Sequence, residues 1–375
     1  MDKNTFRIAR KELAGLFTSP AALIFVGAFL GVTLFTFFWV ETFFSRNIAD
    51  VRPLFEWMPI LLIFLMSAVT MRMWSEERRM GTLEFLMTMP VETGRLVLGK
   101  FLACWGLALT ALALTIFLPI TVSFMGPLDW GPVMGGYAAA AFLAAAYAAV
   151  GLYVSSKTDS QIVSLLVSTL AGAALYVVGS DLLTGFVGNK GSELLKLLGT
   201  GARFESITRG VLDIRDIYYY ASLTAVFLAL NVYSLETLRW SRETAHARHR
   251  TALFTVLLLC GNVLAANLWL KHVGSLRLDM TQGQSYSISP ATKNILSQLR
   301  EPLLIRGYFS QKTHPLLAPL VPQLRDTILE YQTASGGRVR SDPARTRFVA
   351  SRSPRRAHAP TMTPRSRTPS HSRML

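Results

Sequence analysis

Charged residues are scarce in this 375-residue chain: they make up 16% of it, whereas hydrophobic residues make up 51%. The mean hydropathy is positive. A soluble protein of this length needs more polar surface than this composition provides. The composition therefore excludes a soluble globular protein and predicts several membrane spans.

Cysteine is rare in the chain. The two cysteines, Cys104 and Cys260, both fall inside apolar runs. The two cysteines therefore imply neither a disulfide framework nor a cysteine-based metal site. A cleavable signal peptide is not evident either. The first apolar run starts near residue 20, is about the length of a span and is followed by further spans.

Acidic residues and histidines are missing from the interiors of the third to sixth apolar runs, apart from Glu236 at one end. Ionisable residues inside spans would indicate catalysis or a proton relay. Their absence disfavours an intramembrane enzyme, and we predict that the chain is not an enzyme. The spacing Glu243-x2-His246-x2-His249 lies in a strongly basic segment, which favours a basic flank over a metal site.

The net charge of +15 is unevenly spread. From Arg338 to the end, ten arginines face one acid, Asp342, which gives a net charge of +9 in the last tenth of the chain. Because the excess lies mostly in a tail and in loops, the basic balance does not indicate a nucleic-acid partner.

Seven apolar runs are each about 20 residues long, enough to cross ~30 Å of hydrocarbon. They cover about 20–41, 54–73, 100–122, 133–154, 161–180, 217–237 and 251–272. We predict an all-α polytopic membrane protein with a six-span bundle within 20–240 and a seventh span at 251–272. The long segment between the fifth and sixth spans suggests a short external re-entrant or interfacial helix pair.

Lysine and arginine gather on alternate loops. The N-terminal flank and the loop between the second and third spans carry most of them: Lys3, Arg7, Arg10, Lys11, Arg72, Arg78, Arg79, Arg95 and Lys100. The positive-inside rule places the N-terminus and the 74–100 loop in the cytoplasm.

Residues 1–19 have apolar side chains at helical spacing, among them Phe6, Leu13 and Phe17, with basic residues between them. This pattern favours an amphipathic helix in the headgroup plane, with a simple basic flank as the alternative. Small residues at Gly27-x3-Gly31 and along the fourth span favour close helix contacts, although alanine and glycine are also common in spans.

The character of the chain changes after the seventh span. Ser289-Pro290 predicts a helix start, 303–309 reads as a strand, and a second helix is expected at about 318–333. We interpret 273–340 as a partial external α/β domain. The segment 341–375 is expected to be a disordered basic tail. It is either a natural tail or an out-of-frame product that cuts the domain short, and we favour the second.

The loop between the second and third spans combines paired acids, paired bases and a short amphipathic segment that stops at Pro90. Gly94-x4-Gly99-Lys100 has the spacing of a phosphate-binding loop. It lacks the serine or threonine that holds Mg²⁺ and runs straight into a span, so we interpret it as a chance match. No nucleotide site is predicted in the chain itself.

Two separated motifs resemble the ABC type-2 (ABC-2) permease family. The first is Arg10-Lys11-Glu12-Leu13 followed by Phe17-Thr18-Ser19-Pro20, and the second is Glu76-Glu77-Arg78-Arg79-x-Gly81-Thr82-Leu83-Glu84-x-Leu86 followed by Pro90-Val91. Within that family the chain looks closest to the gliding-motility-associated and nitrous-oxide-reductase maturation permeases. Residues 251–340 resemble the companion gliding-motility auxiliary protein through Leu278-Asp279-Met280-Thr281 and Tyr286 to Thr292, although that family's external domain is much longer.

The resemblance implies a permease subunit of an ATP-driven ABC transporter in the bacterial inner membrane. It would act as a dimer with separate ATPase chains that hold ATP and Mg²⁺, and this chain would bind no cofactor of its own. Residues 4–19 would be an interfacial helix, with Arg10, Lys11 and Glu12 in the motif. Residues 74–91 would dock on the ATPase, with Leu83, Phe85, Leu86 and Met89 presented to a cleft.

The docking residues implied by the resemblance are Glu76, Glu77, Arg78, Arg79, Gly81, Thr82, Leu83, Glu84, Leu86 and Pro90. Export is the favoured direction. The alternative is a non-transporting membrane component that uses ATPase-driven motion for surface motility or metalloenzyme assembly.

Overall fold

The structure is a computed structural model. It describes residues 3–46, 49–178, 195, 198–239, 246–270, 277–282, 287–299, 301–305, 324, 327–328, 331–332, 335 and 338–341. The chain divides into two compact units, Met1–Ser287 and Ile288–Leu375. The expected tail, 341–375, lies outside the described residues except for Ser341.

Among its described residues, the first unit contains seven helices or runs of helices long and apolar enough to cross a membrane, which confirms the predicted all-α polytopic fold class. In chain order they are α2 Pro20–Phe35 continued by a π-helical turn, η1 Thr36–Val40, and by α3 Phe43–Arg46; α4 Arg52–Thr70; α7 Thr93–Thr115 with α8 Phe117–Met125; α9 Trp130–Ser155; α10 Gln161–Val178; α14 Ile214–Arg239; and α15 His246–Leu270. Helix α7 begins at Thr93, seven residues before the span predicted at about 100–122. The helix extends beyond the apolar run because backbone hydrogen bonding does not require apolar side chains.

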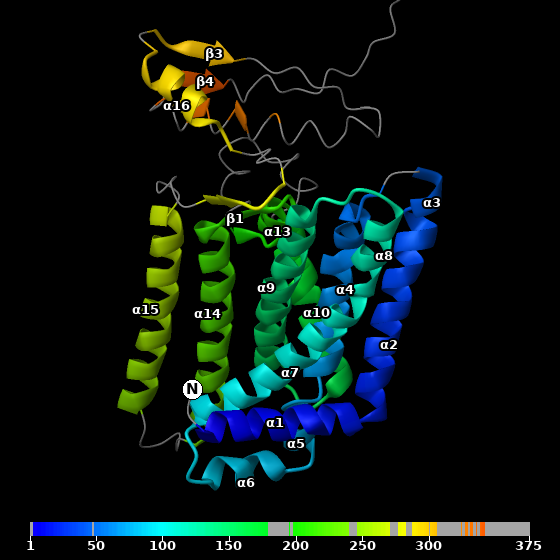
Figure 1. Ribbon diagram of the computed structural model, residues 1–375. Helices are drawn as coiled ribbons and strands as arrows, with labels where there is room; N and C mark the ends of the chain where they lie inside the picture. The colour runs from blue at the N-terminus through cyan, green and yellow to red at the C-terminus, as the bar shows by residue number, and fades with distance from the viewer. Residues whose placement is uncertain are drawn as a thin grey trace, which may run out of the picture. The chain divides into compact units, whose positions relative to one another are not determined.

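Helix α1 (Lys3–Thr18) lies across the ends of the upright spans (Figure 1). It packs on α7 at Gly99, where an added Cβ would come within 2.5 Å of Ile8 Cγ2 and 2.9 Å of Ile8 Cβ. Leu13 packs over Gly106, which lies about two helical turns after Gly99 on α7. Because glycine has no side chain, Gly99 and Gly106 allow α1 to approach α7 closely.

Helix α9 is the central helix of the first unit, with most of its length buried. Its glycines allow three neighbours to approach. An added Cβ would lie 2.1 Å from Thr70 Oγ1 at Gly151, 2.5 Å from the Phe55 ring at Gly136 and 2.4 Å from the Ile207 carbonyl oxygen at Gly135. The close packing predicted for the fourth span is therefore confirmed.

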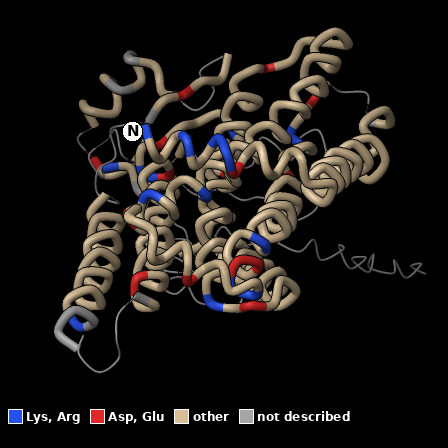
Figure 2. The backbone as a smooth tube through the Cα atoms, turned by 90° about the horizontal axis from the view of Figure 1, so that it is seen from below, with Lys and Arg blue, Asp and Glu red and all other residues tan. Residues whose placement is uncertain are grey.

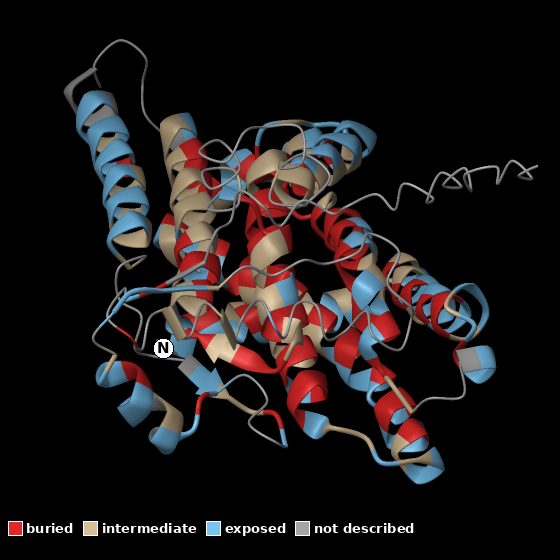
Figure 3. Cartoon of the chain, turned by 90° about the horizontal axis from the view of Figure 1, so that it is seen from above, coloured by how far each residue is buried: buried red, intermediate tan, exposed pale blue. Residues whose placement is uncertain are grey.

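The first span behaves differently. Gly27 and Gly31 are exposed, and a Cβ added at either would meet nothing within 4 Å. The expected close contact at these two glycines is therefore not made among the described residues. At the edge of the unit, α15 is exposed over most of its length, in contrast to the buried α9 (Figure 3).

A small antiparallel ladder closes the end of the first unit opposite α1 (Figure 1). Strand β1 (Val211–Asp213) follows α13 (Gly201–Thr208) and pairs with β2 (Arg277–Asp279), which follows the seventh span. Gly210 has φ +88°, a conformation that favours glycine, and its carbonyl oxygen accepts from the Met280 amide at 2.9 Å. Of the helix pair expected in 181–216, helix α13 lies among the described residues, whereas 181–194 lie outside them.

The second unit carries α16 (Pro290–Ser297), β3 (Leu303–Ile305) and β4 (Val339–Ser341). The predicted N-cap is confirmed, because Ser289 Oγ accepts from the Thr292 amide at 3.2 Å. The strands β3 and β4 pair in parallel, and Ile288, Leu296 and Val339 form a small core. Strand β4 was not predicted. The expected helix at 318–333 lies mostly outside the described residues.

Candidate functional site

The loop between α4 and α7 folds as two short helices. Helix α5 (Ser75–Arg79) and helix α6 (Thr82–Thr88) are separated by Gly81, whose φ is +71°. The Gly81 amide donates to the Arg78 carbonyl at 3.1 Å and so helps to close the end of α5. Because an L side chain rarely adopts this φ, glycine at this position permits the turn that redirects α6.

The start of the loop is fixed to the end of α9. Ser155 Oγ accepts from the amides of Trp74 at 3.1 Å and Ser75 at 3.2 Å, and it donates to the Met71 carbonyl at 3.1 Å. Trp74 is fully buried. A single serine on the fourth span therefore ties down both the end of the α4 segment and the first turn of α5.

A buried lysine joins α1, α5 and α7. Lys100 Nζ donates to Glu77 at 2.8 Å and to Glu12 at 3.4 Å, and it lies 4.9 Å from the centroid of the Trp74 ring. The Lys100 side chain is only 4% exposed. A buried charge is tolerated only when it is paired, so this cluster fixes α5 relative to the N-terminal helix.

The next residue of α5 is engaged on the opposite side. Arg78 pairs with Asp159 at 2.9 Å and donates to the Ser156 carbonyl at 2.8 Å. Burial, together with the positive charge of Arg78, lowers the pKa of nearby Lys157. Glu77 and Arg78, both predicted to contact an ATPase, are thus held by this chain's own residues.

Helix α6 has one face turned inward and one face turned outward. Leu83 and Met87 are buried, whereas Phe85 is 66% exposed, Met80 is 62% exposed and Met89 is 38% exposed. The expectation that α6 presents Leu83 is therefore wrong, because the helix turns that side chain into the bundle. A hollow of about 460 Å³ lies along α6 and reaches Leu238 at the end of α14.

Charged residues surround the exposed apolar side chains. Arg79 and Glu84 are exposed, as are Gly81, Thr82 and Pro90, whereas Glu76 and Leu86 are partly buried. Glu76 pairs with Arg72 at 3.2 Å, one helical turn away. Figure 2 views this end of the molecule and shows basic and acidic residues close together there. We call the exposed set Arg79, Met80, Glu84, Phe85 and Met89 the outer face of the loop.

The interfacial-helix motif is split between surface and interior. Arg10 and Lys11 are exposed, whereas Glu12 is half-buried and reaches Lys100. Within the apparent phosphate-loop spacing, Gly94 and Gly99 lie on helix α7, and Gly99 packs against α1. A helical segment packed in this way is not a phosphate cradle, which agrees with the prediction of a chance match.

The sequence interpretation missed the residues that hold the loop in place. Ser155 is the last residue of the fourth span, and Ser156 and Asp159 follow it. Lys100 was interpreted only as a basic loop residue and as part of a chance phosphate-loop match. A single lysine at the edge of an apolar run was the available signal for Lys100. Among the described residues no group of acids, histidines and cysteines could hold a metal ion, and the side chains of the Glu243–His249 spacing lie outside them.

The comparisons with known proteins agree with this architecture. Residues 46–186, which include α4 to α10 and the whole loop, match the family described as ABC-2 family transporter protein. Residues 282–343 match a domain of unknown function (DUF7088) and include α16, β3 and β4. No curated protein matches the chain. The chain is a multi-pass membrane protein, and its residues 46–186 are similar to the ABC-2 transporter family.

Proposed function

We propose that this chain is the permease subunit of an ATP-driven ABC exporter and that the outer face of the 74–91 loop docks on a separate ATPase subunit. In this proposal the N-terminus and the loop are cytoplasmic and the membrane is the bacterial inner membrane. The chain pairs with a second copy and supplies no nucleotide site. ATP and Mg²⁺ belong to the partner.

The observation that carries this proposal is the exposure of large apolar side chains on a rigidly held loop. Phe85 and Met80 are 66% and 62% exposed and stand beside the charged Arg79 and Glu84. An apolar centre with a charged rim is the usual composition of a protein interface. A short helix of this kind can lie in a groove of a partner.

The attachment of the loop gives the proposal a mechanical basis. Ser155 ties the loop to α9, Lys100 ties it to α7 and α1, and Arg78 ties it to the segment after α9. A force applied to the outer face would therefore be transmitted to three parts of the bundle through short, partly buried contacts. This is the property that coupling to an ATPase requires.

The test is co-purification of an ABC ATPase subunit with this chain. Phe85→Asp should weaken the complex by ~30-fold or more, because loss of a central aromatic anchor costs ~2 kcal/mol or more. Phe85→Leu keeps an apolar side chain and should retain most of the binding. Undiminished co-purification of Phe85→Asp would sink the docking role.

Glu76→Lys with Glu77→Lys is a less clean test than the sequence suggested. Glu77 holds buried Lys100, so its replacement by lysine places two positive charges together and disturbs the bundle itself. Arg79→Glu with Glu84→Lys changes only exposed residues. This pair should weaken ATPase binding and leave membrane insertion intact.

The resemblance to motility and metalloenzyme-assembly permeases remains a prediction. ATPase activity of the reconstituted complex separates the two roles. Stimulation by a transported substrate in vesicles supports export, whereas activity that no substrate changes favours the mechanical role. No contact among the described residues favours the mechanical role specifically.

A further inference from the structure

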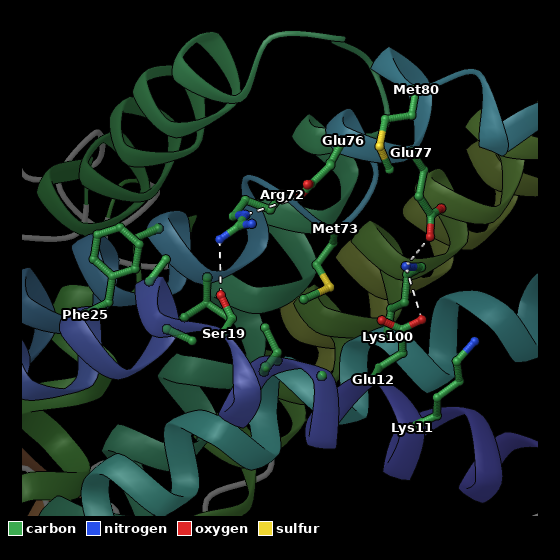
Figure 4. A pocket seen from close by; sticks show the side chains of 16 residues that line it. Lys11, Glu12, Ser19, Phe25, Arg72, Met73, Glu76, Glu77, Met80 and Lys100 are labelled. Carbon is green, nitrogen blue, oxygen red and sulfur yellow. Dashed lines mark hydrogen bonds and ion pairs between the residues drawn. The ribbon is translucent and has the colours of Figure 1, made fainter.

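A cavity of about 330 Å³ lies on the side of α5 that faces α1 and α2, away from the hollow along α6. Its walls come from α1, α2, the end of α4, α5 and Lys100 of α7 (Figure 4). Its size falls within the range of small-molecule sites, ~300–1,000 Å³. The docking proposal does not use this cavity.

One side of the cavity is apolar and lies beside a guanidinium group. Ala22 and Phe25 of α2 and Val69 of α4 line this part. Figure 4 shows Arg72 between Phe25 and the deeper polar cluster, with its guanidinium toward Ser19. Arg72 donates through Nε to Glu76 at 3.2 Å and through Nη1 to Ser19 at 3.3 Å. Since a guanidinium has five N–H groups, Arg72 has donors left for an anion.

The other side of the cavity carries an excess of negative charge. Glu12 and Glu77 share the single ammonium of Lys100, so these three groups have a formal net charge of −1. Glu77 Oε2 is buried and accepts no hydrogen bond from any described residue. Lys11 lies at the rim and is exposed, so water screens its charge. This side favours a compact cation with N–H groups.

The order of these features matches one class of molecule. From the apolar wall inward, the cavity offers contact for a hydrocarbon chain, then spare donors for an anion, then the carboxylates of Glu12 and Glu77 for a cation. A phospholipid with an amine headgroup has its acyl chain, phosphate and ammonium in the same order.

We propose that this cavity binds an amine-bearing zwitterionic phospholipid, with its phosphate at Arg72 and its ammonium at the Glu12–Glu77 side. A purely anionic lipid would bring its charge toward two carboxylates, and a choline headgroup has no N–H to donate to either of them. The bound lipid would join α1 to the α4–α5 segment. The inference goes beyond the docking proposal and requires only that α1 lies at headgroup depth.

The test uses the full-length chain in vesicles of phosphatidylglycerol, phosphatidylcholine or phosphatidylethanolamine with identical acyl chains. Each vesicle contains a trace of its own lipid with a photoreactive group near the glycerol. We expect phosphatidylethanolamine to label peptides of α1–α2 and α4–α5 about 10-fold more than phosphatidylglycerol does, and also more than phosphatidylcholine. Equal labelling by all three lipids would reveal only the surrounding bilayer and would overturn the proposal.

Matched variants locate the site. Ala22→Phe fills the cavity and should reduce labelling about 10-fold. Ala28→Phe, on the exposed face of the same helix, should leave labelling unchanged. Glu12→Gln should lower the ratio of labelling by phosphatidylethanolamine to labelling by phosphatidylglycerol. Glu84→Gln on α6 should leave this ratio unchanged. Unchanged labelling of Ala22→Phe would refute the location.

Two controls separate a loss of lipid binding from a loss of fold. Thermal unfolding of each variant identifies any loss of fold, and Glu12→Gln tests the headgroup without adding bulk. Co-purification of the ATPase is measured on the same samples. If the unaltered chain binds the ATPase but shows no lipid preference, only the lipid site is rejected. If it shows the lipid preference but does not bind the ATPase, only the docking role is rejected.

Discussion

The two short helices of the 74–91 loop are adjacent in sequence and similar in polarity, yet the structure uses them in opposite ways. The charged residues of α5 turn toward the bundle, where Glu77 meets Lys100 and Arg78 meets Asp159. Helix α6 instead leaves Phe85 exposed and buries Leu83 beside it. Charge, which is normally found on surfaces, holds this loop in place, and an aromatic side chain is left exposed.

The largest effect is expected at the centre of the anchored half. Lys100→Met should lower the free energy of unfolding by ~3–5 kcal/mol, the usual cost of breaking a buried ion pair by removing one partner. The reason is that Glu77 and Glu12 would lose their shared cation. Thermal or denaturant unfolding in detergent measures the loss.

A double-mutant cycle with Glu77→Gln sharpens this prediction. If the pair is coupled, the double variant should be less destabilised than the sum of the single variants. Additive effects would mean that Lys100 contributes through packing alone and that the anchored half of the loop does not depend on charge.

The second prediction separates the two faces of α6. Leu83→Ala should destabilise the fold by ~2–3 kcal/mol, since a buried leucine is truncated. Phe85→Ala should change stability by less than ~0.5 kcal/mol, because its side chain is mostly exposed. Unfolding measurements on both variants, together with ATPase co-purification, compare the faces directly. Equal destabilisation would remove the distinction between them.

The smallest effect is expected at the joint between the two helices. A Cβ at Gly81 would meet no atom within 4 Å, so Gly81→Ala adds no clash. Its φ of +71° still costs an alanine ~1 kcal/mol. Gly94→Ala is the matched control, because Gly94 also has open space but lies in the helix α7. It should be neutral or stabilising by up to ~1 kcal/mol.

For Gly81→Ala we expect a modest loss of stability and a larger loss of ATPase binding, because the turn determines where α6 points. Unfolding and co-purification of the two alanine variants decide the matter. A Gly81→Ala chain that binds the ATPase as well as the unaltered chain would show that the turn does not determine the docking geometry.

Much of the fold was predictable because membrane spans follow from local composition. Each apolar run of about 20 residues became a helix, and Ser289 became an N-cap as its sequence context indicated. The limits of α7 were less predictable, because helical hydrogen bonds continue beyond the apolar segment to Thr93. Strand β4 was missed because three residues after a glycine pair carry little pattern, and its pairing with β3 is a long-range contact.

The position of the loop could be predicted from the sequence, but which of its side chains are exposed could not. The paired acids and bases of residues 76–79 marked it as exceptional, but the sequence gives no partner for any of them. Lys100 lies 23 residues from Glu77, and Glu12 lies 88 residues from Lys100. Glycine spacing was informative on α9 and misleading at Gly27 and Gly31, because only packing shows which glycines meet a neighbour.

The sequence by itself determined that this protein spans a membrane several times and that an unusual charged loop separates its second and third spans. The spans and the loop can be recognised from runs of neighbouring residues alone. An apolar run of about 20 residues partitions into the bilayer whatever its tertiary contacts are. The tertiary structure alone decided which loop residues anchor and which are presented. That division depends on Lys100, Ser155 and Asp159, which come close to the loop only when the helices pack.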